Sequence, residues 1–153
     1  MNSLALGGIL KRFYPSFSMT TFSNRLKLQK IIYLIQSDVT NLGYVYEWYL
    51  YGPYSTQLTK DAYNIQEYAE TKPIAFEDKV ISTKFDEFIK KIEPHKDDTK
   101  WLEVASSIHL LKKLYPQKTK SDIIVQIQNK RGNNTIDKTF ISNVWLDVEG
   151  WLI

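Results

Sequence analysis

The feature that most constrains the fold is a change of hydrophobic period within residues 26–58. The first half of this stretch repeats apolar residues at steps of three or four, which is the spacing of one face of an α-helix. These apolar residues are Leu28, Ile31, Ile32, Ile35, Val39 and Leu42. Thr21 or Ser23 can cap the start of the helix, and Gly43 stands where helices commonly end. We therefore expect an amphipathic helix that ends by Gly43.

After Gly43 the period falls to two, and aromatic residues dominate. The alternating residues run from Tyr44 to Tyr51, in the order YVYEWYLY. Residues of this kind favour strands. Gly52-Pro53 should end the strand, because proline fixes φ and has no N–H to donate to a ladder.

Ser55 is placed to cap the helix that follows this turn. The apolar residues of that helix share one face; they are Leu58, Ala62, Ile65 and Ala69. The stretch thus predicts a helix, a strand, a tight turn and a second helix in succession.

The order and spacing of these elements resemble a known family signature. LKLQKIIYLIQ followed by WYLYGPYSTQLT is similar to the motif of Panacea-type antitoxin domains, found in SocA-like and phage-associated GepA-like proteins, and is closer still to the YwgA-like family. The resemblance covers residues 22–65. WLEVASSIHLL, from Trp101 to Leu111, resembles the C-terminal helix of YwgA-like proteins.

The resemblance implies a function in protein binding. Panacea domains bind and neutralise diverse small toxins, and SocA delivers its toxin to a protease. We therefore expect a non-enzymatic interaction module, an antitoxin or an adaptor that masks a partner protein. The residues expected to contact the partner are Lys30, Tyr33, Trp48, Tyr49, Tyr51, Tyr54 and Ser55.

The aromatic strand leaves two interpretations of its faces open. One face, with Trp48 or its neighbours, is expected to pack on the preceding helix. The other face either binds a partner, since exposed Tyr and Trp are favoured at interfaces, or is covered by helices predicted over residues 99–115 and 138–152. A protein, a toxin in the case of an antitoxin, is the expected partner; nucleic acid and a second copy of the chain are the alternatives.

Composition narrows the class of protein. The chain has 153 residues, 43% of them hydrophobic and 24% charged, as in ordinary globular proteins. This length suits a single domain over residues 1–153 with its own core. The absence of cysteine excludes disulfides and thiol catalysis and is compatible with the cytoplasm. The longest apolar runs are too short to span a bilayer, so no membrane partner is expected.

The rest of the chain predicts further helices. Their expected ranges are 3–13, 83–92, 99–115, 119–129 and 138–152. Capping boxes should open two of them, at Thr83 with Asp86 and at Thr119 with Asp122. IAFEDKVI, residues 74–81, could supply a second strand beside the aromatic one. The predicted fold class is mainly α, a helical bundle with a small antiparallel β-sheet, winged-helix-like.

The sequence offers no catalytic constellation. His95 stands in a predicted loop, where Asp98 three residues later does not share a helix face with it, and His109, on a predicted helix, has no second histidine or carboxylate at the i+3 or i+4 position that a helical metal site would use. HExxH, GxSxG and phosphate-binding glycine loops are all missing from the sequence. We therefore predict no catalytic residue, no metal and no cofactor.

The basic C-terminal part supports a different function. Residues 104–153 carry seven basic and four acidic side chains, within a net charge of +3. A winged-helix-like DNA binder would use such residues on two short helices for phosphate contacts. The residues concerned are Lys118, Lys120, Lys130, Arg131 and Lys138. The connection from residue 129 to residue 135 is longer than the usual turn of such motifs, and a solvated surface is the favoured explanation of the charges.

Overall fold

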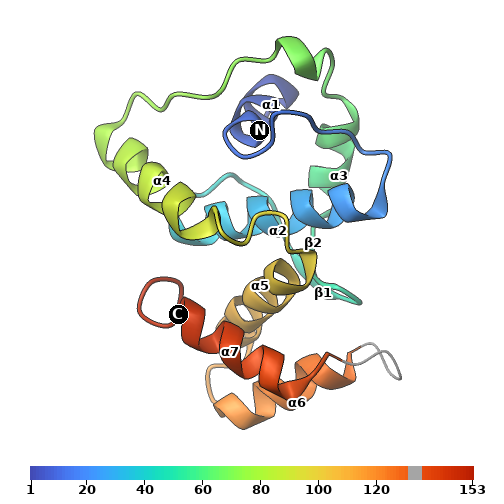
Figure 1. Ribbon diagram of the computed structural model, residues 1–153, viewed down its shortest axis with the longest axis vertical. Helices are drawn as coiled ribbons and strands as arrows, with labels where there is room; N and C mark the ends of the chain where they lie inside the picture. The colour runs from blue at the N-terminus through green and yellow to red at the C-terminus, as the bar shows by residue number, and fades with distance from the viewer. Residues whose placement is uncertain (131–135) are drawn as a thin grey trace.

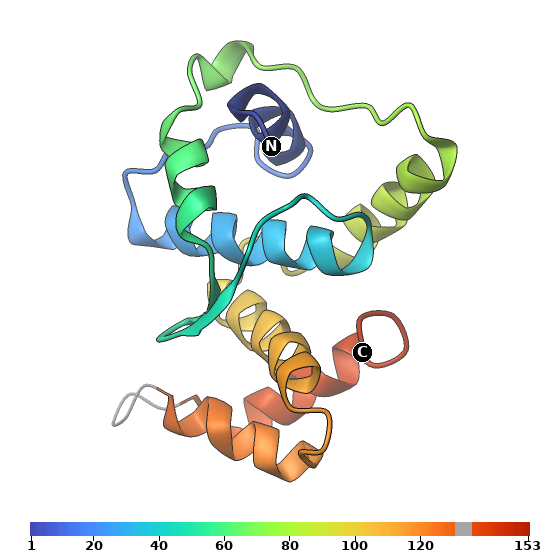
Figure 2. The same cartoon turned by 180° about the vertical axis from the view of Figure 1, so that it is seen from behind.

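The computed structural model describes residues 1–130 and 136–153, and within them it is mainly helical with one small antiparallel sheet (Figures 1 and 2), which confirms the predicted fold class. The elements in chain order are α1 (Ser3–Lys11), α2 (Phe22–Asp38), β1 (Glu47–Tyr49), β2 (Gly52–Tyr54), α3 (Thr56–Tyr63), a 3₁₀ turn (Tyr68–Glu70), α4 (Lys79–Ile92), α5 (Thr99–Leu114), α6 (Lys120–Asn129) and α7 (Lys138–Val148).

Helices α2 and α5 lie at the centre of the arrangement. Figure 1 shows α1, α3 and α4 on one side of α2, and α5, α6 and α7 on the other side. Helix α2 packs against α5, while α6 and α7 pack against α5 and against each other. The hairpin of β1 and β2 lies beside the crossing of the two central helices, because β2 contacts both of them. In chain order the hairpin precedes the group α5–α7.

The burial of the two central helices follows from this position. Every residue from Leu28 to Ile35 is buried, and so is every residue from Trp101 to Ile108. A helix buried on all sides must also bury its polar residues. Those of α2 and α5 are Gln29, Lys30, Glu103, Ser106 and Ser107. Such groups need internal partners, and several of these partners come from the hairpin.

The hairpin differs from the strand predicted over residues 44–51. Only Glu47–Tyr49 forms β1, and the chain reverses at Leu50 and Tyr51, before Gly52. Gly52–Tyr54 then returns as β2, with Pro53 opposite Trp48. Proline is tolerated here because each strand of a two-stranded sheet has an unpaired edge, where a missing N–H costs no ladder bond.

Helix boundaries were predicted best where a cap is local. The Thr21 side chain accepts a hydrogen bond from the N–H of Asn24, and Ser55 accepts one from Leu58, as predicted. The capping box of Thr119 and Asp122 is also present. Helix α2 nevertheless ends at Asp38, before Gly43.

Three predictions around residues 64–86 were wrong. Helix α3 ends at Tyr63, so Ile65 lies beyond it. Residues 74–78 form no strand, and the N–H of Ile74 donates instead to the carbonyl of Gly8 in α1. Helix α4 begins at Lys79 because Asp78 caps it, so Thr83 lies inside the helix and is not its cap.

Candidate functional site

Two glutamines of α2 hold the two ends of the hairpin segment. Gln29 donates from Nε2 to the carbonyl of Ser55 at 3.0 Å and accepts from the Ser55 N–H at 2.8 Å. Gln36, two turns further along α2, makes the same pair of bonds to Tyr44, at 2.8 and 3.0 Å. Residues seven apart lie on one face of a helix. Helix α2 therefore fixes the segment 44–55 through peptide groups at both of its ends.

Lys30 holds the middle of the returning strand. Its ammonium donates to the carbonyl of Pro53 at 2.6 Å, and the side chain is only 2% exposed. Gly52 has φ of +93°, and a Cβ added there would lie 2.5 Å from Ser107 Oγ. Strand β2 thus lies directly against α5, in a conformation and a space that suit glycine. The two halves of the motif, KLQK and YGPYS, are the two sides of one contact.

The residues predicted to contact a partner fall into two groups in the structure, one buried inside the fold and one on the hairpin. Lys30 and Ser55 are internal, at 2% and 1% exposure, and their side chains position the hairpin. Tyr33 is also buried and faces a different cavity. Their polar groups are thus used within the fold.

The remaining predicted residues come together on the hairpin. Tyr49 is 58% exposed, whereas Tyr51 and Tyr54 are half-buried. Trp48 is half-buried against the core, with the ammonium of Lys130 4.8 Å from its ring centroid. Tyr49, Tyr51 and Tyr54 therefore form the accessible part of the predicted set.

These tyrosines line a small groove between the hairpin and the start of α2. Phe22 packs on Tyr51 in an edge-to-face arrangement with centroids 5.1 Å apart, and Tyr49 packs on Tyr54 at 5.5 Å. Both pairs line one cavity of about 190 Å³, together with Arg25. We call this cavity the aromatic groove.

Sequence reasoning missed several residues of this surface, among them Phe22, Leu50 and Arg25. Phe22 is 50% exposed, Leu50 at the hairpin turn is 47% exposed, and Arg25 lines the groove. Phe22 lies off the apolar stripe of α2 and Arg25 lies one turn before its first residue, Leu28, so only the position of the hairpin brings them into the site. The one local signal in the sequence was the placing of a large aromatic residue, Phe22, directly after the predicted cap Thr21.

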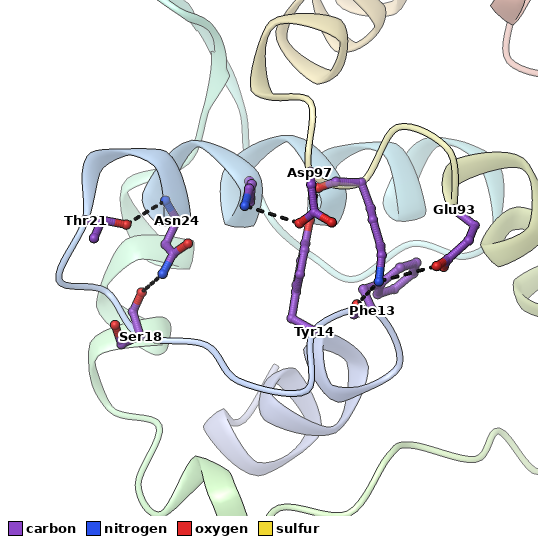
Figure 3. A network of polar contacts seen from close by, with 9 residues as sticks. Phe13, Tyr14, Ser18, Thr21, Asn24, Glu93 and Asp97 are labelled. Carbon is purple, nitrogen blue, oxygen red and sulfur yellow. Dashed lines mark hydrogen bonds and ion pairs between the residues drawn. The ribbon is translucent and has the colours of Figure 1, made fainter.

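A polar network fixes the helix end that carries Phe22 and Arg25 (Figure 3). Asn24 donates from Nδ2 to the carbonyl of Ser18 at 3.1 Å. Tyr14 donates from its hydroxyl to the carbonyl of Lys96 at 2.6 Å, and the Lys96 ammonium donates to the carbonyl of Phe13 at 2.7 Å. The segment before α2 is thus tied to the loop between α4 and α5, and the α2 wall of the groove has a fixed position.

A second cavity, of about 570 Å³, lies where Tyr33 and His109 meet. The Tyr33 hydroxyl and His109 Nδ1 share a hydrogen bond of 2.6 Å. Burial, with a smaller contribution from Lys113 and Lys112, lowers the pKa of His109 to about 4, and burial raises the pKa of Tyr33 above its ordinary value. Both groups are therefore neutral at pH 7, and an imidazole of such low basicity is a poor general base there.

The basic residues of the DNA-binding alternative that the structure describes lie at the ends of α6 and the start of α7. Lys118 donates to Gln126 Oε1 at 2.8 Å and lies over the ring of Tyr115. Lys120 lies over the ring of Trp145, and Lys130 over that of Trp48. Each of these ammonium groups thus packs on a ring, while the side chains of Lys118 and Lys120 are exposed. Lys138 is exposed at the start of α7, and Arg131 lies outside the described residues.

Among the described residues, no three His, Asp or Glu side chains gather closely enough to hold a metal ion. None of the helices described is both long and apolar enough to cross a bilayer.

Comparison with protein-family models, with curated proteins and with solved structures gave no significant match.

Proposed function

We propose that this chain is a non-enzymatic, cytoplasmic protein-binding module, an antitoxin or an adaptor, that acts by covering a surface of its partner protein. The observation that carries the proposal is the exposed tip of the hairpin. Tyr49 and Leu50 are about half exposed there, beside Phe22 of α2. Together they present large apolar side chains to solvent next to the aromatic groove.

The construction of this tip suits binding. Aromatic side chains at the centre of an interface contribute much of its affinity, and a surface that is ordered before binding loses less entropy on association. Gln29 and Gln36 bond to the peptide groups at the two ends of the hairpin segment, and the Lys30 ammonium donates to the Pro53 carbonyl between them. The resemblance of residues 22–65 to Panacea-type and YwgA-like domains supports the same function.

Affinity capture under native expression tests the proposal. The wild-type chain should return a protein partner in about equimolar amount, and the variant Tyr49→Ala with Leu50→Ser should lose it. Val80→Ser is the matched control, because Val80 is an equally exposed apolar residue on α4. Retention of the partner by the hairpin variant would place binding elsewhere, and the absence of any protein partner would contradict the proposal.

The nature of the partner distinguishes an antitoxin from an adaptor. A partner that arrests growth when expressed alone, and that is harmless in the presence of this chain, identifies an antitoxin. Accelerated proteolysis of the partner when this chain is present identifies an adaptor. Both readouts use the same pair of hairpin and control variants.

A further inference from the structure

We propose that the aromatic groove receives one bulky apolar side chain of a partner protein, with an aromatic residue favoured, flanked by a carboxylate that pairs with Arg25. This inference rests on the proposed protein-binding function and specifies the chemistry of the segment that is bound. It is carried by the size of the groove, the arrangement of its rings and the charge of Arg25.

The size of the groove favours a single side chain over a free small molecule. Its volume is about 190 Å³, below the roughly 300–1,000 Å³ of most small-molecule sites. Gln29, Lys30 and Thr59 also line it, but Gln29 donates to Thr59 Oγ1 at 2.8 Å and Lys30 to the carbonyl of Pro53 at 2.6 Å. Their hydrogen bonding is thus partly satisfied within the fold, and the rings dominate what a guest would meet.

The rings are arranged to receive another apolar group. Phe22 and Tyr51 come from α2 and the hairpin turn, with interplanar angle 71°. Tyr49 and Tyr54 come from the two strands and are tilted by 36°. The four rings therefore offer both faces and edges, and added aromatic contacts favour such offset or edge-on geometries over flat stacking.

Of the two cations that line the groove, Arg25 and Lys30, we expect Arg25 to decide which charge the guest carries, because Lys30 is 2% exposed and its ammonium is bonded to the Pro53 carbonyl. Its Nη1 donates to the carbonyl of Met19 at 2.9 Å, and none of the ion pairs formed among the described residues includes it. A guanidinium has five N–H donors and suits carboxylates. An aromatic cage can also bind a cation, but the positive charge of Arg25 on the same cavity opposes a cationic guest and favours an acidic one.

Three blocked peptides test the charge and the apolar requirement together. They are Ac-Glu-Trp-Glu-NH₂, Ac-Lys-Trp-Lys-NH₂ and Ac-Glu-Ala-Glu-NH₂, titrated into the ¹⁵N-labelled chain and followed by amide chemical shifts. The acidic Trp peptide should shift amides of residues 22–30 and 49–54 and bind about fivefold more tightly than the basic one, the change expected for one exposed ion pair. The Ala peptide should not bind measurably.

Variants then assign the charge preference to one residue. Arg25→Gln should remove most of the preference for the acidic over the basic peptide, and Arg25→Lys should retain most of it. Lys60→Gln is the control, because Lys60 is an exposed cation on α3 that does not line the groove. Equal binding of all three peptides, shifts confined to other surfaces, or a preference unchanged in Arg25→Gln would overturn the inference.

The outcome is separable from that of the proposed function. If native capture returns a partner that depends on the hairpin, while the peptides bind without the predicted preference, this inference is wrong and the proposed function stands. If the acidic Trp peptide binds as predicted, while native capture returns no partner, the groove chemistry stands and the proposed function is wrong.

Discussion

The side chain of Gln29 binds both backbone polar groups of Ser55, although 26 residues separate them along the chain. One amide side chain thus satisfies the N–H and the carbonyl of a residue that is 1% exposed. The same Ser55 caps α3 with its hydroxyl. The end of the hairpin and the start of α3 therefore depend on one residue of α2.

Replacing Gln29 by leucine should lower the free energy of unfolding by roughly 1–3 kcal/mol. The buried N–H of Ser55 would lose its bond to Gln29, and leaving such a group unpaired costs about that much, whereas the Ser55 carbonyl would keep the bonds donated by the N–H and the hydroxyl of Thr59. Urea denaturation measures the change. Gln36→Leu is the matched control, because its bonds to Tyr44 are only part-buried and water can replace them. Equal losses for the two variants would show that burial of Ser55 is not the cause.

Replacing Gly52 by alanine should destabilise the fold more than the same change at Gly43. Both glycines have positive φ, +93° and +85°, so both changes introduce backbone strain of about 1–3 kcal/mol. Only at Gly52 would the new Cβ meet another atom, Ser107 Oγ, within 4 Å. Thermal melting of the two single variants should show the larger loss at Gly52. Adding Ser107→Ala should recover part of it, and no recovery would exclude this clash as the cause.

Trp48→Ala should lower the melting temperature more than Tyr54→Ala. Trp48 packs against the core but is half-buried, so the loss should fall below the ~3–5 kcal/mol of a buried tryptophan. Tyr54→Ala removes the hydrogen bond that Thr59 Oγ1 donates to the Tyr54 hydroxyl, and the ring contact with Tyr49. This should lower the free energy of unfolding by about 1 kcal/mol. Calorimetry of both variants decides. Equal losses would assign Tyr54 to the core and remove it from the proposed binding surface.

Acidification should destabilise the chain through His109. Its pKa is lowered to about 4 in the folded chain, from an ordinary value of 6.5. Between these values the unfolded chain binds a proton that the folded chain does not, so stability falls as the pH drops from about 6.5 to 4 and is constant above that window. The slope is at most ~1.4 kcal/mol per pH unit and is reduced by partial solvent exposure of the ring.

The variant His109→Gln isolates this contribution. Its unfolding free energy should fall less steeply than that of the wild type between pH 6.5 and 4, measured by urea denaturation at several pH values. Tyr33→Phe is the control, because it removes the hydroxyl that bonds to His109 but leaves the imidazole ring of His109 buried. This variant should keep the wild-type dependence of unfolding free energy on pH. Identical slopes for wild type and His109→Gln would contradict the low pKa.

Local signals in the sequence predicted local structure well. The caps at Thr21, Ser55 and Thr119 were found because each depends on residues within one turn. The strand expected over residues 74–81 was wrong, because Asp78 starts α4 inside that range. Apolar alternation over so few residues does not distinguish a strand from a loop that packs on α1.

The site was predicted only in part, for a physical reason. Tyr49, Tyr51 and Tyr54 were named from the motif that resembles a family signature, and they line one groove; their contact with a partner stays a prediction. The burial of Lys30 could not be foreseen, since lysine is almost never fully buried unless paired, and its partner carbonyl at Pro53 is fixed only by tertiary structure. Arg25 was missed because its place beside the groove depends on where the hairpin docks.

The close approach of Gly52 to Ser107 has a consequence for the order in which the chain is assembled during synthesis. Helix α2 and the hairpin emerge first, and the contacts of Gln29 and Lys30 with the hairpin need only residues up to Ser55. The wall on which Gly52 rests belongs to α5 and is synthesised much later. A nascent chain therefore keeps one side of the hairpin uncovered until α5 docks, and a partner that requires the finished hairpin can bind only after that step.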